Sequence, residues 1–168
     1  RTRQRRQGAC HERGNGFGQG IDSFIEIHPQ EEVSPDDGAA SAETALPRWL
    51  ESRKSQAPRA PFFASVLLTN PRLPFNPPGE YRDKFLDRPV PLPRLEQLTQ
   101  LWLPFARQFS VGAASLTPEE MAAMTALYDG EITYVDYRLG RIIEALKAAK
   151  LLDETLVVVT SDSGEDLG

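Results

Sequence analysis

The sequence is poor in cysteine, in histidine and in long apolar runs. Of its 168 residues one is a cysteine, Cys10, and two are histidines, so the chain forms no intramolecular disulfide and no zinc cage built of cysteines. No run approaches the ~20 apolar residues that cross a bilayer, which argues against a membrane span. We expect Cys10 to be an inert thiol and His11 and His28 to be surface residues without a metal-binding role.

Charge is unevenly distributed along the chain. The net charge is −5, but residues 1–13 hold five arginines against Glu12, which leaves −9 on the rest. Because binding to phosphate groups needs a basic face, the acidic body argues against nucleic acid as the main partner. The arginine cluster is followed by no apolar run, so it does not have the form of a secretory signal, and the compartment stays open.

Glycine and proline divide the chain into regions of a single domain. The apolar share of 40%, which reaches about 47% when the 12 glycines are added, is typical of a globular chain, and the length predicts one domain. Five of the 12 glycines lie between Gly8 and Gly20, and all 14 prolines lie between Pro29 and Pro118. We interpret residues 1–38 as a loop-rich lead-in, residues 41–160 as the α/β core portion and residues 161–168 as a terminal loop.

Two helices are predicted from the spacing of apolar residues. Residues 41–54 carry one helical stripe, and Pro47 within it indicates a helix that either kinks there or begins there. Residues 117–120 (Thr-Pro-Glu-Glu) form a capping box with proline at the first helical position. Apolar residues then recur every three or four positions, from Met121 through Tyr128 and Ile132 to Leu146. We expect a helix of about 30 residues, ~45 Å long, that ends near residues 147–150.

Two short runs without polar alternation predict strands that are buried on both faces: PFFASVLLT (61–69) and TLVVVT (155–160). A strand, a long connection with a helix and a second strand make a βαβ unit. The predicted class is therefore α/β, with part of a mainly parallel sheet flanked by helices. In such folds the chemistry lies beyond the carboxyl ends of the strands, which singles out the loops 70–81 and 161–168.

Three blocks of sequence resemble the sulfatase family of the alkaline phosphatase superfamily. GNGFGQGIDSF (14–24) is similar to a G-F…G-F-D passage of that family, and PFFASVLLTNPRLPFNPPGEYRDKF (61–85) to its strand and D-P-H-x-P-Y-x-P-P loop. YDGEITYVDYRLGRIIEALKAAKLLDETLVVVTSDSGEDLG (128–168) resembles its long helix and a strand that ends T-S-D-H-G-E or T-S-D-N-G. The resemblance implies an alkaline phosphatase-like fold, hydrolysis of sulfate monoesters and a divalent cation, commonly calcium.

The resemblance also implies three site residues. Asp162 stands at the position of a metal-ligand aspartate, and oxygen ligands suit a hard cation. Ser163 stands where the family has histidine or asparagine, and its hydroxyl is a weaker ligand. Arg72 replaces a histidine that contacts the sulfate and assists departure of the alcohol. A guanidinium binds an oxyanion well, but it does not release its proton in proteins and therefore cannot act as a general acid.

The nucleophile expected from the family is missing from the sequence. It is a cysteine in C-x-P-S-R that is oxidised to formylglycine, whereas Cys10 begins C-H-E-R. The family's downstream lysine and histidine would follow Gly168. We therefore expect this chain to be a partial sulfatase-like domain that needs the remainder of that domain as its partner. Alone it is expected to leave an aryl sulfate unhydrolysed, even with calcium supplied.

Two other functions stay open beside the sulfatase-like hydrolase. One keeps the superfamily but acts on a phosphate ester or a phospholipid head group, with threonine or serine as nucleophile. The other is a non-catalytic relic or binding module, which the replacements at Arg72 and Ser163 favour. The identity of the nucleophile, which is expected upstream of Arg1, would distinguish the sulfatase-like hydrolase from the enzyme that acts on a phosphate ester.

Several residues also have a purely structural interpretation. Without the resemblance, Asp162 fits a turn or a helix cap, and Arg72 fits a surface arginine. Glu131 and Asp136 lie in the predicted long helix, where we interpret them as part of a solvated or salt-bridged face. The two tryptophans, Trp49 and Trp102, are interpreted as core residues.

Overall fold

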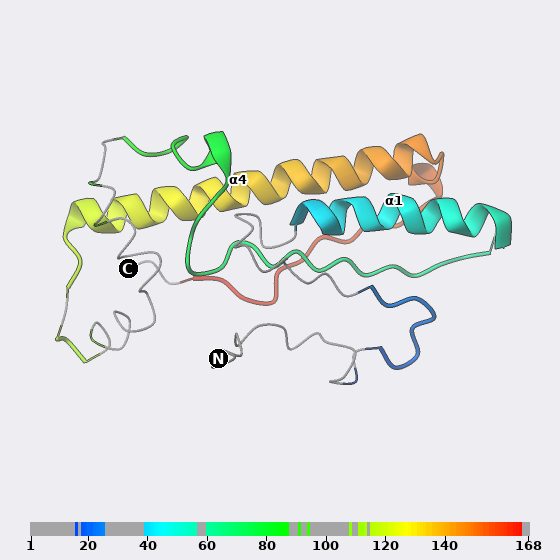
Figure 1. The fold of residues 1–168 in the computed structure, drawn as a ribbon, viewed down its shortest axis with the longest axis horizontal. Helices are drawn as coiled ribbons and strands as arrows, with labels where there is room; N and C mark the ends of the chain where they lie inside the picture. The colour runs from blue at the N-terminus through cyan, green and yellow to red at the C-terminus, as the bar shows by residue number, and fades with distance from the viewer. Residues whose placement is uncertain are drawn as a thin grey trace, which may run out of the picture.

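The structure is a computed structural model, and it describes residues 16, 18–25, 39–56, 60–87, 91, 94, 108, 111–113 and 115–165. Two α-helices dominate these residues, α1 (Ala39–Gln56) and α4 (Pro118–Ala148). Two short 3₁₀ helices, η2 (Gly79–Tyr81) and η3 (Leu152–Glu154), lie in the connections. Figure 1 shows α1 and α4 side by side and running in the same direction. Neither helix of the described part is long and apolar enough to cross a membrane.

Helix α1 confirms the predicted apolar stripe and continues through Pro47. Of the two alternatives left open at Pro47, a helix that begins there is excluded, because the chain is already helical from Ala39. Proline in a helix interior costs about 3 kcal/mol, since it donates no hydrogen bond and its ring crowds the preceding turn. Packing offsets that cost, because Leu46 and Leu50 are buried against helix α4.

The aromatic side of α1 packs on the extended segment that follows it. The rings of Trp49 and Phe62 meet edge to face, with 5.5 Å between their centroids. The guanidinium of Arg53 lies 4.9 Å from the centroid of the Trp49 ring, and Arg53 also donates a hydrogen bond to the carbonyl of Ala60. Trp49 therefore borders the core, as predicted, whereas Trp102, Cys10, His11 and His28 lie outside the described residues.

Helix α4 confirms the predicted capping box and the predicted length. The hydroxyl of Thr117 accepts a hydrogen bond from the backbone N–H of Glu120 at 3.2 Å, and the Glu120 carboxylate accepts one from the N–H of Thr117 at 2.9 Å. Together they satisfy two of the N–H groups that a helix start leaves unpaired. The helix has 31 residues. Its local sequence signals were sufficient to place its beginning.

We predict that this cap makes the stability of the chain depend on acidity. Hydrogen bonds from Arg94 and from the Thr117 backbone lower the pKa of Glu120 below its ordinary value of 4.5. The contribution is fully present above that unfolded-state value and is lost as the pH falls through the lower folded-state pKa. Replacing Glu120 with glutamine should lower the melting temperature by a few degrees at most near neutral pH. In acid the difference should vanish, which thermal melts at both pH values measure; a gap that persists in acid would contradict this assignment.

The carboxyl end of α4 is closed by a Schellman motif that uses lysine in place of the usual glycine. Lys150 has a positive φ of 58°, and its N–H donates to the carbonyl of Lys147 at 2.9 Å. The N–H of Leu151 donates to the carbonyl of Leu146 at 3.0 Å. Leu151 also packs against the cluster that contains Leu146, the apolar contact that accompanies such motifs. The predicted helix end near residues 147–150 is confirmed.

Two apolar clusters lie at different points along α4. The first joins the loop 70–81 to the first half of the helix, and the second joins α1 to its last turns. The buried members of the first cluster are Phe75, Ala123, Met124 and Leu127, and those of the second are Leu46, Leu50, Ile142 and Leu146. Helix α4 is therefore the element against which α1, η2 and η3 pack.

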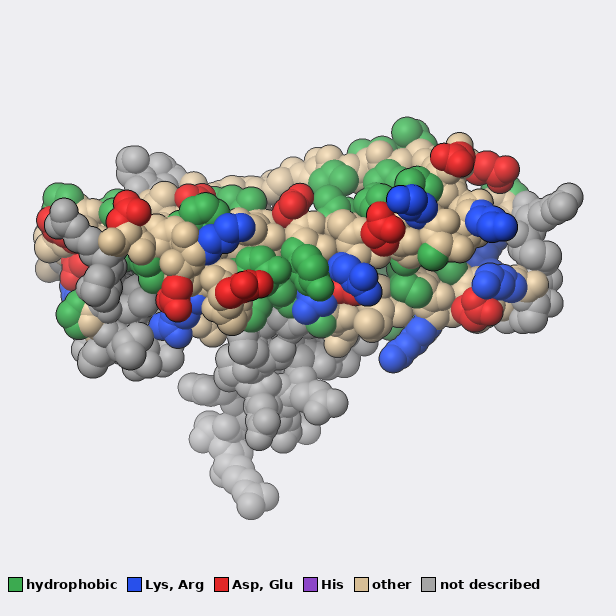
Figure 2. Space-filling view, turned by 90° about the horizontal axis from the view of Figure 1, so that it is seen from above, with side chains coloured by type: hydrophobic (Ala, Val, Ile, Leu, Met, Phe, Trp, Pro, Cys, Tyr) green, Lys and Arg blue, Asp and Glu red, His purple; other side chains and the backbone are tan. Residues whose placement is uncertain are grey.

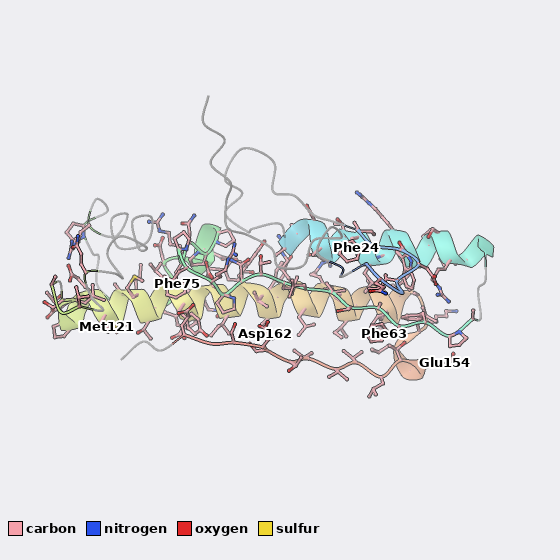
Figure 3. The ribbon with its side chains drawn as sticks, turned by 90° about the horizontal axis from the view of Figure 1, so that it is seen from below. Phe24, Phe63, Phe75, Met121, Glu154 and Asp162 are labelled. Atoms are coloured by element: carbon pink, nitrogen blue, oxygen red, sulfur yellow. The ribbon has the colours of Figure 1, made fainter. Side chains whose placement is uncertain are left out.

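The predicted strands are present as extended segments without strand pairing in the described residues. Figures 1 and 3 show segments 61–69 and 155–160 on the same side of the helices, running in the same direction as each other and opposite to α4. That arrangement matches a βαβ unit. The predicted burial is not found in this chain, because side chains such as Phe63 (87%) and Leu156 (89%) are exposed. The sheet itself stays a prediction.

Candidate functional site

The proline-rich loop 70–81 is attached to helix α4 at several points. Phe75 is buried against Leu127 and its neighbours in the helix. Further along the loop, the backbone of Tyr81 approaches the helix so closely that only glycine fits opposite it, at Gly130. The loop that the sequence singled out as a strand-end loop therefore has a defined position on α4.

A buried carboxylate in α4 holds the backbone of this loop. Glu131 is 1% exposed, and its two oxygens each accept a hydrogen bond from the loop. Its Oε2 accepts from the N–H of Arg72 at 3.0 Å, and its Oε1 accepts from the N–H of Asn76 at 2.8 Å. The interpretation of Glu131 as part of a solvated helix face is wrong, because backbone N–H groups of the loop replace water as its partners.

The burial of Glu131 could have been predicted from the sequence if a different set of residues had been assigned to the buried face of the long helix. The buried face of α4 passes through Met124, Leu127, Glu131 and Tyr134. The predicted stripe instead passed through Ile132, which is 43% exposed. A carboxylate four residues after one buried apolar position and three before another lies on the inward face. That spacing was the signal that the sequence analysis missed.

Arg72 has a fixed backbone and an exposed side chain. Its N–H is bound by Glu131, while the residue as a whole is exposed. The preceding Asn70 is 7% exposed, and its Oδ1 has no hydrogen-bond partner. The peptide bonds that precede Pro71 and Pro74 are cis. The loop thus presents a guanidinium at the surface from an anchored backbone, which suits contact with an anion.

The loop after the second extended segment carries Asp162 at the surface. The hydroxyl of Ser163 donates to Oδ1 of Asp162 at 3.3 Å, and the hydroxyl of Ser161 donates to the carbonyl of Ser163 at 2.5 Å. Asp162 and Ser163 are both exposed. Among the described residues no group of three or more His, Cys, Asp or Glu side chains is placed to hold a metal ion.

The two candidate loops follow segments that run the same way. Figure 3 shows Phe75 and Asp162 nearer to the Met121 end of α4 than Phe63 and Glu154 are. Because Arg72 precedes Phe75 by three residues, both loops leave their segments toward the same end of the helix. This is the relation expected of loops at the carboxyl edge of a parallel sheet.

An ionic network ties α1 to α4. Glu43 accepts hydrogen bonds from Arg138 at 2.6 Å and from Arg141 at 3.3 Å. Arg138 also donates to the hydroxyl of Tyr134 at 2.8 Å. Burial acts to lower the pKa of Arg138, but the hydrogen bonds to Glu43 and Tyr134 outweigh it and raise the pKa. A permanently charged guanidinium that is paired in this way is a structural crosslink between the two helices.

A cluster of tyrosines borders the same network. The rings of Tyr81 and Tyr134 meet edge to face with 5.2 Å between centroids, and Tyr137 lies beside Tyr81 at 6.2 Å. Burial, with a smaller effect from the Glu80 carboxylate, raises the pKa of the Tyr81 phenol. The phenol therefore stays protonated near neutral pH, and the cluster serves packing of η2 against α4.

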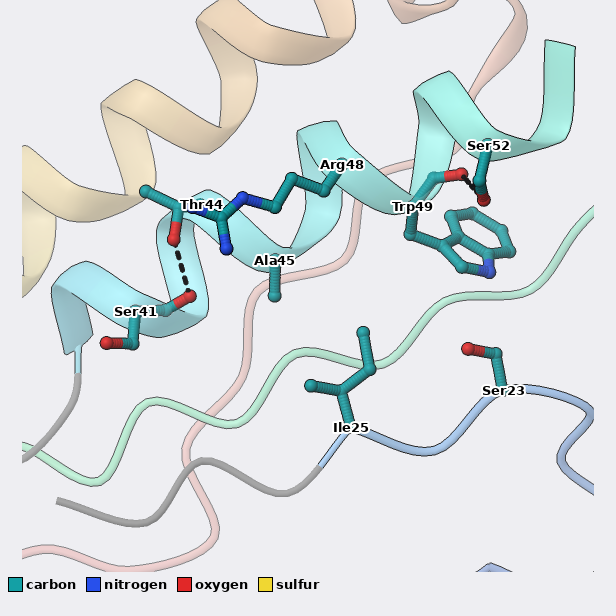
Figure 4. Close-up of a pocket in the computed structure, with 8 residues that line it drawn as sticks. All are labelled: Ser23, Ile25, Ser41, Thr44, Ala45, Arg48, Trp49 and Ser52. Carbon is teal, nitrogen blue, oxygen red and sulfur yellow. Dashed lines mark hydrogen bonds between the residues drawn. The ribbon is translucent and has the colours of Figure 1, made fainter. Parts of the chain in front are cut away.

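A shallow hollow of about 490 Å³ lies beside α1, between the helix and residues 23–25 (Figure 4). Its hydroxyl groups are partly committed, because Thr44 donates to the carbonyl of Ser41 and Ser52 donates to that of Trp49. Among the described residues that line it, Arg48 carries the only charge, and none of them is acidic or a histidine.

Charges of both signs are mixed on the helical face of the molecule. Figure 2 shows acidic and basic side chains interspersed along this face, with apolar side chains between them. Ion pairs one helical turn apart occur on both helices, Glu51 with Lys54 at 2.5 Å and Glu144 with Lys147 at 3.7 Å. Exposed pairs of this kind add little stability and present no field of one sign on this face.

Comparison with known proteins assigns the chain to a family. The family model described as Sulfatase matches residues 4–168. The arylsulfatase of Clostridium perfringens (strain 13 / Type A) is 26% identical over 113 residues, which cover 66% of this chain and 24% of the relative. The iduronate 2-sulfatase of Mus musculus is 27% identical over 143 residues, which cover 76% of this chain and 25% of the relative.

A third relative has a broader description. The multifunctional alkaline phosphatase superfamily protein PehA of Trinickia caryophylli is 44% identical over 55 residues, 33% of this chain and 11% of that protein. No solved structure matches the chain significantly. The chain spans a quarter or less of the length of these relatives. The family match nevertheless covers nearly all of the chain, which therefore belongs to the sulfatase family of the alkaline phosphatase superfamily.

Proposed function

We propose that this chain supplies the anion-contact loop and one cation-ligand loop of a hydrolase that acts on sulfate monoesters. Arg72 contacts the sulfate group, and Asp162 and Ser163 are ligands to a divalent cation. The observation that carries the proposal is the anchored loop, whose backbone is bound by a buried Glu131 while the Arg72 side chain is exposed. Membership of the sulfatase family supports the substrate class.

The chemistry of Arg72 limits its role to binding. Its planar guanidinium offers paired donors that match two oxygens of a tetrahedral oxyanion. Because guanidinium groups do not act as proton donors in proteins, it stabilises negative charge on the sulfuryl oxygens without protonating the leaving alcohol. In this proposal another group, outside the Arg72 loop, protonates the alcohol.

The described residues fit a divalent cation in kind but not in number. The Asp162 carboxylate and the Ser163 hydroxyl are hard oxygen donors of the type that calcium takes, and a hydrogen bond holds them together at 3.3 Å. Calcium binds about 6–8 oxygens, so these two side chains provide only part of a coordination shell. We propose that the remaining ligands come from the rest of the sulfatase domain.

A phosphate ester is the alternative substrate, and the match to PehA favours it. Phosphate and sulfate monoesters both present tetrahedral oxyanions, so the donors of Arg72 suit either. The two groups differ in charge, because a phosphate monoester carries up to two negative charges and a sulfate monoester carries one. Comparing the two inorganic anions on the same protein therefore separates the candidates.

We predict that the 168-residue chain binds inorganic sulfate through Arg72. In an NMR titration with sodium sulfate, the side-chain Nε–H signal of Arg72 should shift and saturate. Replacing Arg72 with alanine should weaken sulfate binding about tenfold, the loss expected when hydrogen bonds to a charged group are removed. The titration is repeated with inorganic phosphate, and tighter binding of phosphate would favour the alternative substrate.

Arg48 provides the matched control for this titration. It is an exposed arginine of α1 that lines the hollow away from the candidate loops. The Arg48→Ala variant should bind sulfate as the wild type does. Equal loss in both variants would mean that sulfate responds to net charge alone, and unchanged binding by Arg72→Ala would overturn the proposed contact.

A further inference from the structure

The loop 70–81, which the buried carboxylate of Glu131 contacts, has few backbone N–H groups that can donate hydrogen bonds. Residues 71–78 include four prolines, so only Arg72, Leu73, Phe75 and Asn76 have a backbone N–H. Two of these four donors, those of Arg72 and Asn76, go to Glu131. A loop so poor in donors has few other ways to fix its backbone, and this one uses a side chain of α4.

The pattern of donors requires a carboxylate at this position. Both loop groups donate, so the side chain from α4 must accept with both of its terminal atoms. An ionised carboxylate offers two acceptors, whereas the amide of glutamine offers one acceptor and one donor group. In glutamine the amide NH₂ would face an N–H of the loop. Glutamate at position 131 can therefore accept both hydrogen bonds from the loop, whereas glutamine can accept only one of them.

The two hydrogen bonds bracket the part of the loop that is buried. Phe75, which is 1% exposed, lies between Arg72 and Asn76 and packs against Met124 and Leu127, two turns and one turn before Glu131. Within residues 72–76, the apolar contact fixes Phe75, and the Glu131 carboxylate fixes the backbone at Arg72 and at Asn76. The Arg72 side chain leaves this fixed frame toward solvent.

The geometry points to Glu131 as the positioning residue that sets the orientation of Arg72 for binding an oxyanion. The inference rests on the proposed function, because it takes Arg72 to be the anion contact. Glu131 acts through the backbone of the loop and does not touch the anion. An arginine on an anchored backbone loses less conformational freedom on binding, so removal of the anchor weakens the binding of sulfate even though the guanidinium remains.

The experiment combines hydrogen exchange with a sulfate titration of the 168-residue chain and its Glu131→Gln variant. In the variant, the amides of Arg72 and Asn76 should exchange about tenfold faster or more, as expected when a hydrogen bond to a charged acceptor is lost. The amides of Ile142 and Leu146, at the far end of α4, should be unchanged. Sulfate binding should weaken several-fold while the Arg72 side chain is retained.

The matched control is Glu144→Gln, an exposed glutamate of the same helix. It should change neither the exchange of the loop amides nor the binding of sulfate. If Glu131→Gln fails to fold, the exchange of the wild-type chain decides. Slow exchange at Arg72 and Asn76 beside fast exchange at Leu73, whose N–H has no such acceptor, supports the inference, and equally fast exchange at all three overturns it.

The outcomes separate this inference from the proposed function. Weaker sulfate binding in Arg72→Ala, with unchanged binding in Glu131→Gln, would overturn the positioning role and leave the anion contact standing. No sulfate binding by the wild-type chain would overturn the anion contact, and with it the role of Glu131 in binding. Weaker binding in both variants, with faster exchange confined to the loop, supports both.

Discussion

Replacing Gly130 with alanine is expected to destabilise the chain by about 3 kcal/mol. A Cβ atom added at this position would press against the carbonyl oxygen of Tyr81 and lie 3.0 Å from the Cγ of Pro77. The carbonyl belongs to the backbone of η2 and cannot rotate away as a flexible side chain would. Either the loop or the helix must shift, and the contacts of the loop with α4 are lost. Urea unfolding, followed by helical circular dichroism, measures the change.

Gly140 in the same helix is the matched control. Nothing lies within 4 Å of a Cβ atom added there, and the residue is exposed. Gly140→Ala should therefore stabilise the chain by about 0.5–1 kcal/mol, because alanine loses less backbone freedom in a helix than glycine does. Opposite signs for one substitution at two positions of one helix would identify the loop contact as the cause. A small effect at Gly130 would show that the loop does not approach α4 as described.

The helices could be predicted because their signals are local. The capping box at Thr117 and the stripe of α1 involve residues a few positions apart, and short-range spacing decides them. The exception was Pro47, where propensity alone left open whether the helix kinks or begins. Packing of Leu46 and Leu50 against α4 decided between the two, and such packing depends on a helix that lies about 90 residues further along the chain.

The site was predicted at the level of loops and missed at the level of contacts. The positions of Arg72 and Asp162 after extended segments follow from the order of elements and from the family resemblance. The contact between Glu131 and the loop joins residues 59 and 55 positions apart. The predicted apolar stripe was displaced by one residue along the helix, so Glu131 was predicted to be solvated although it is buried. Long-range polar contacts of this kind are not determined by local pattern.

The predicted sheet shows the limit of reading strands from composition. Segments 61–69 and 155–160 have the apolar, β-branched composition of strands buried on both faces, and they are extended as expected. Backbone pairing, however, requires a neighbouring strand, and in the described residues neither segment has one. In a parallel sheet, helices on the two faces would cover such exposed apolar side chains, and neighbouring strands would pair with the backbone edges.

Replacing Phe75 with alanine should cost about 3–5 kcal/mol, the loss expected for a fully buried aromatic side chain. Phe75 is 1% exposed and packs with Met124 and Leu127, and its ring meets that of Tyr128 edge to face at 5.3 Å between centroids. Truncation leaves a cavity beneath the loop between the two backbone groups that Glu131 binds. Urea unfolding of the variant measures the loss, and exchange of the Arg72 amide should become faster.

Phe63 is the matched control, because it is the same residue type in the extended segment that leads to the loop. It is 87% exposed, so Phe63→Ala should change the unfolding free energy by no more than about 0.5 kcal/mol. The pair also decides between the sequence prediction and the structure. If Phe63→Ala is as costly as Phe75→Ala, then residues 61–69 are packed in solution, and the buried strand predicted from the sequence forms in this chain. If it is neutral, the apolar surface of this segment is available to a neighbouring strand, and stability resides in the contacts of the loop with α4.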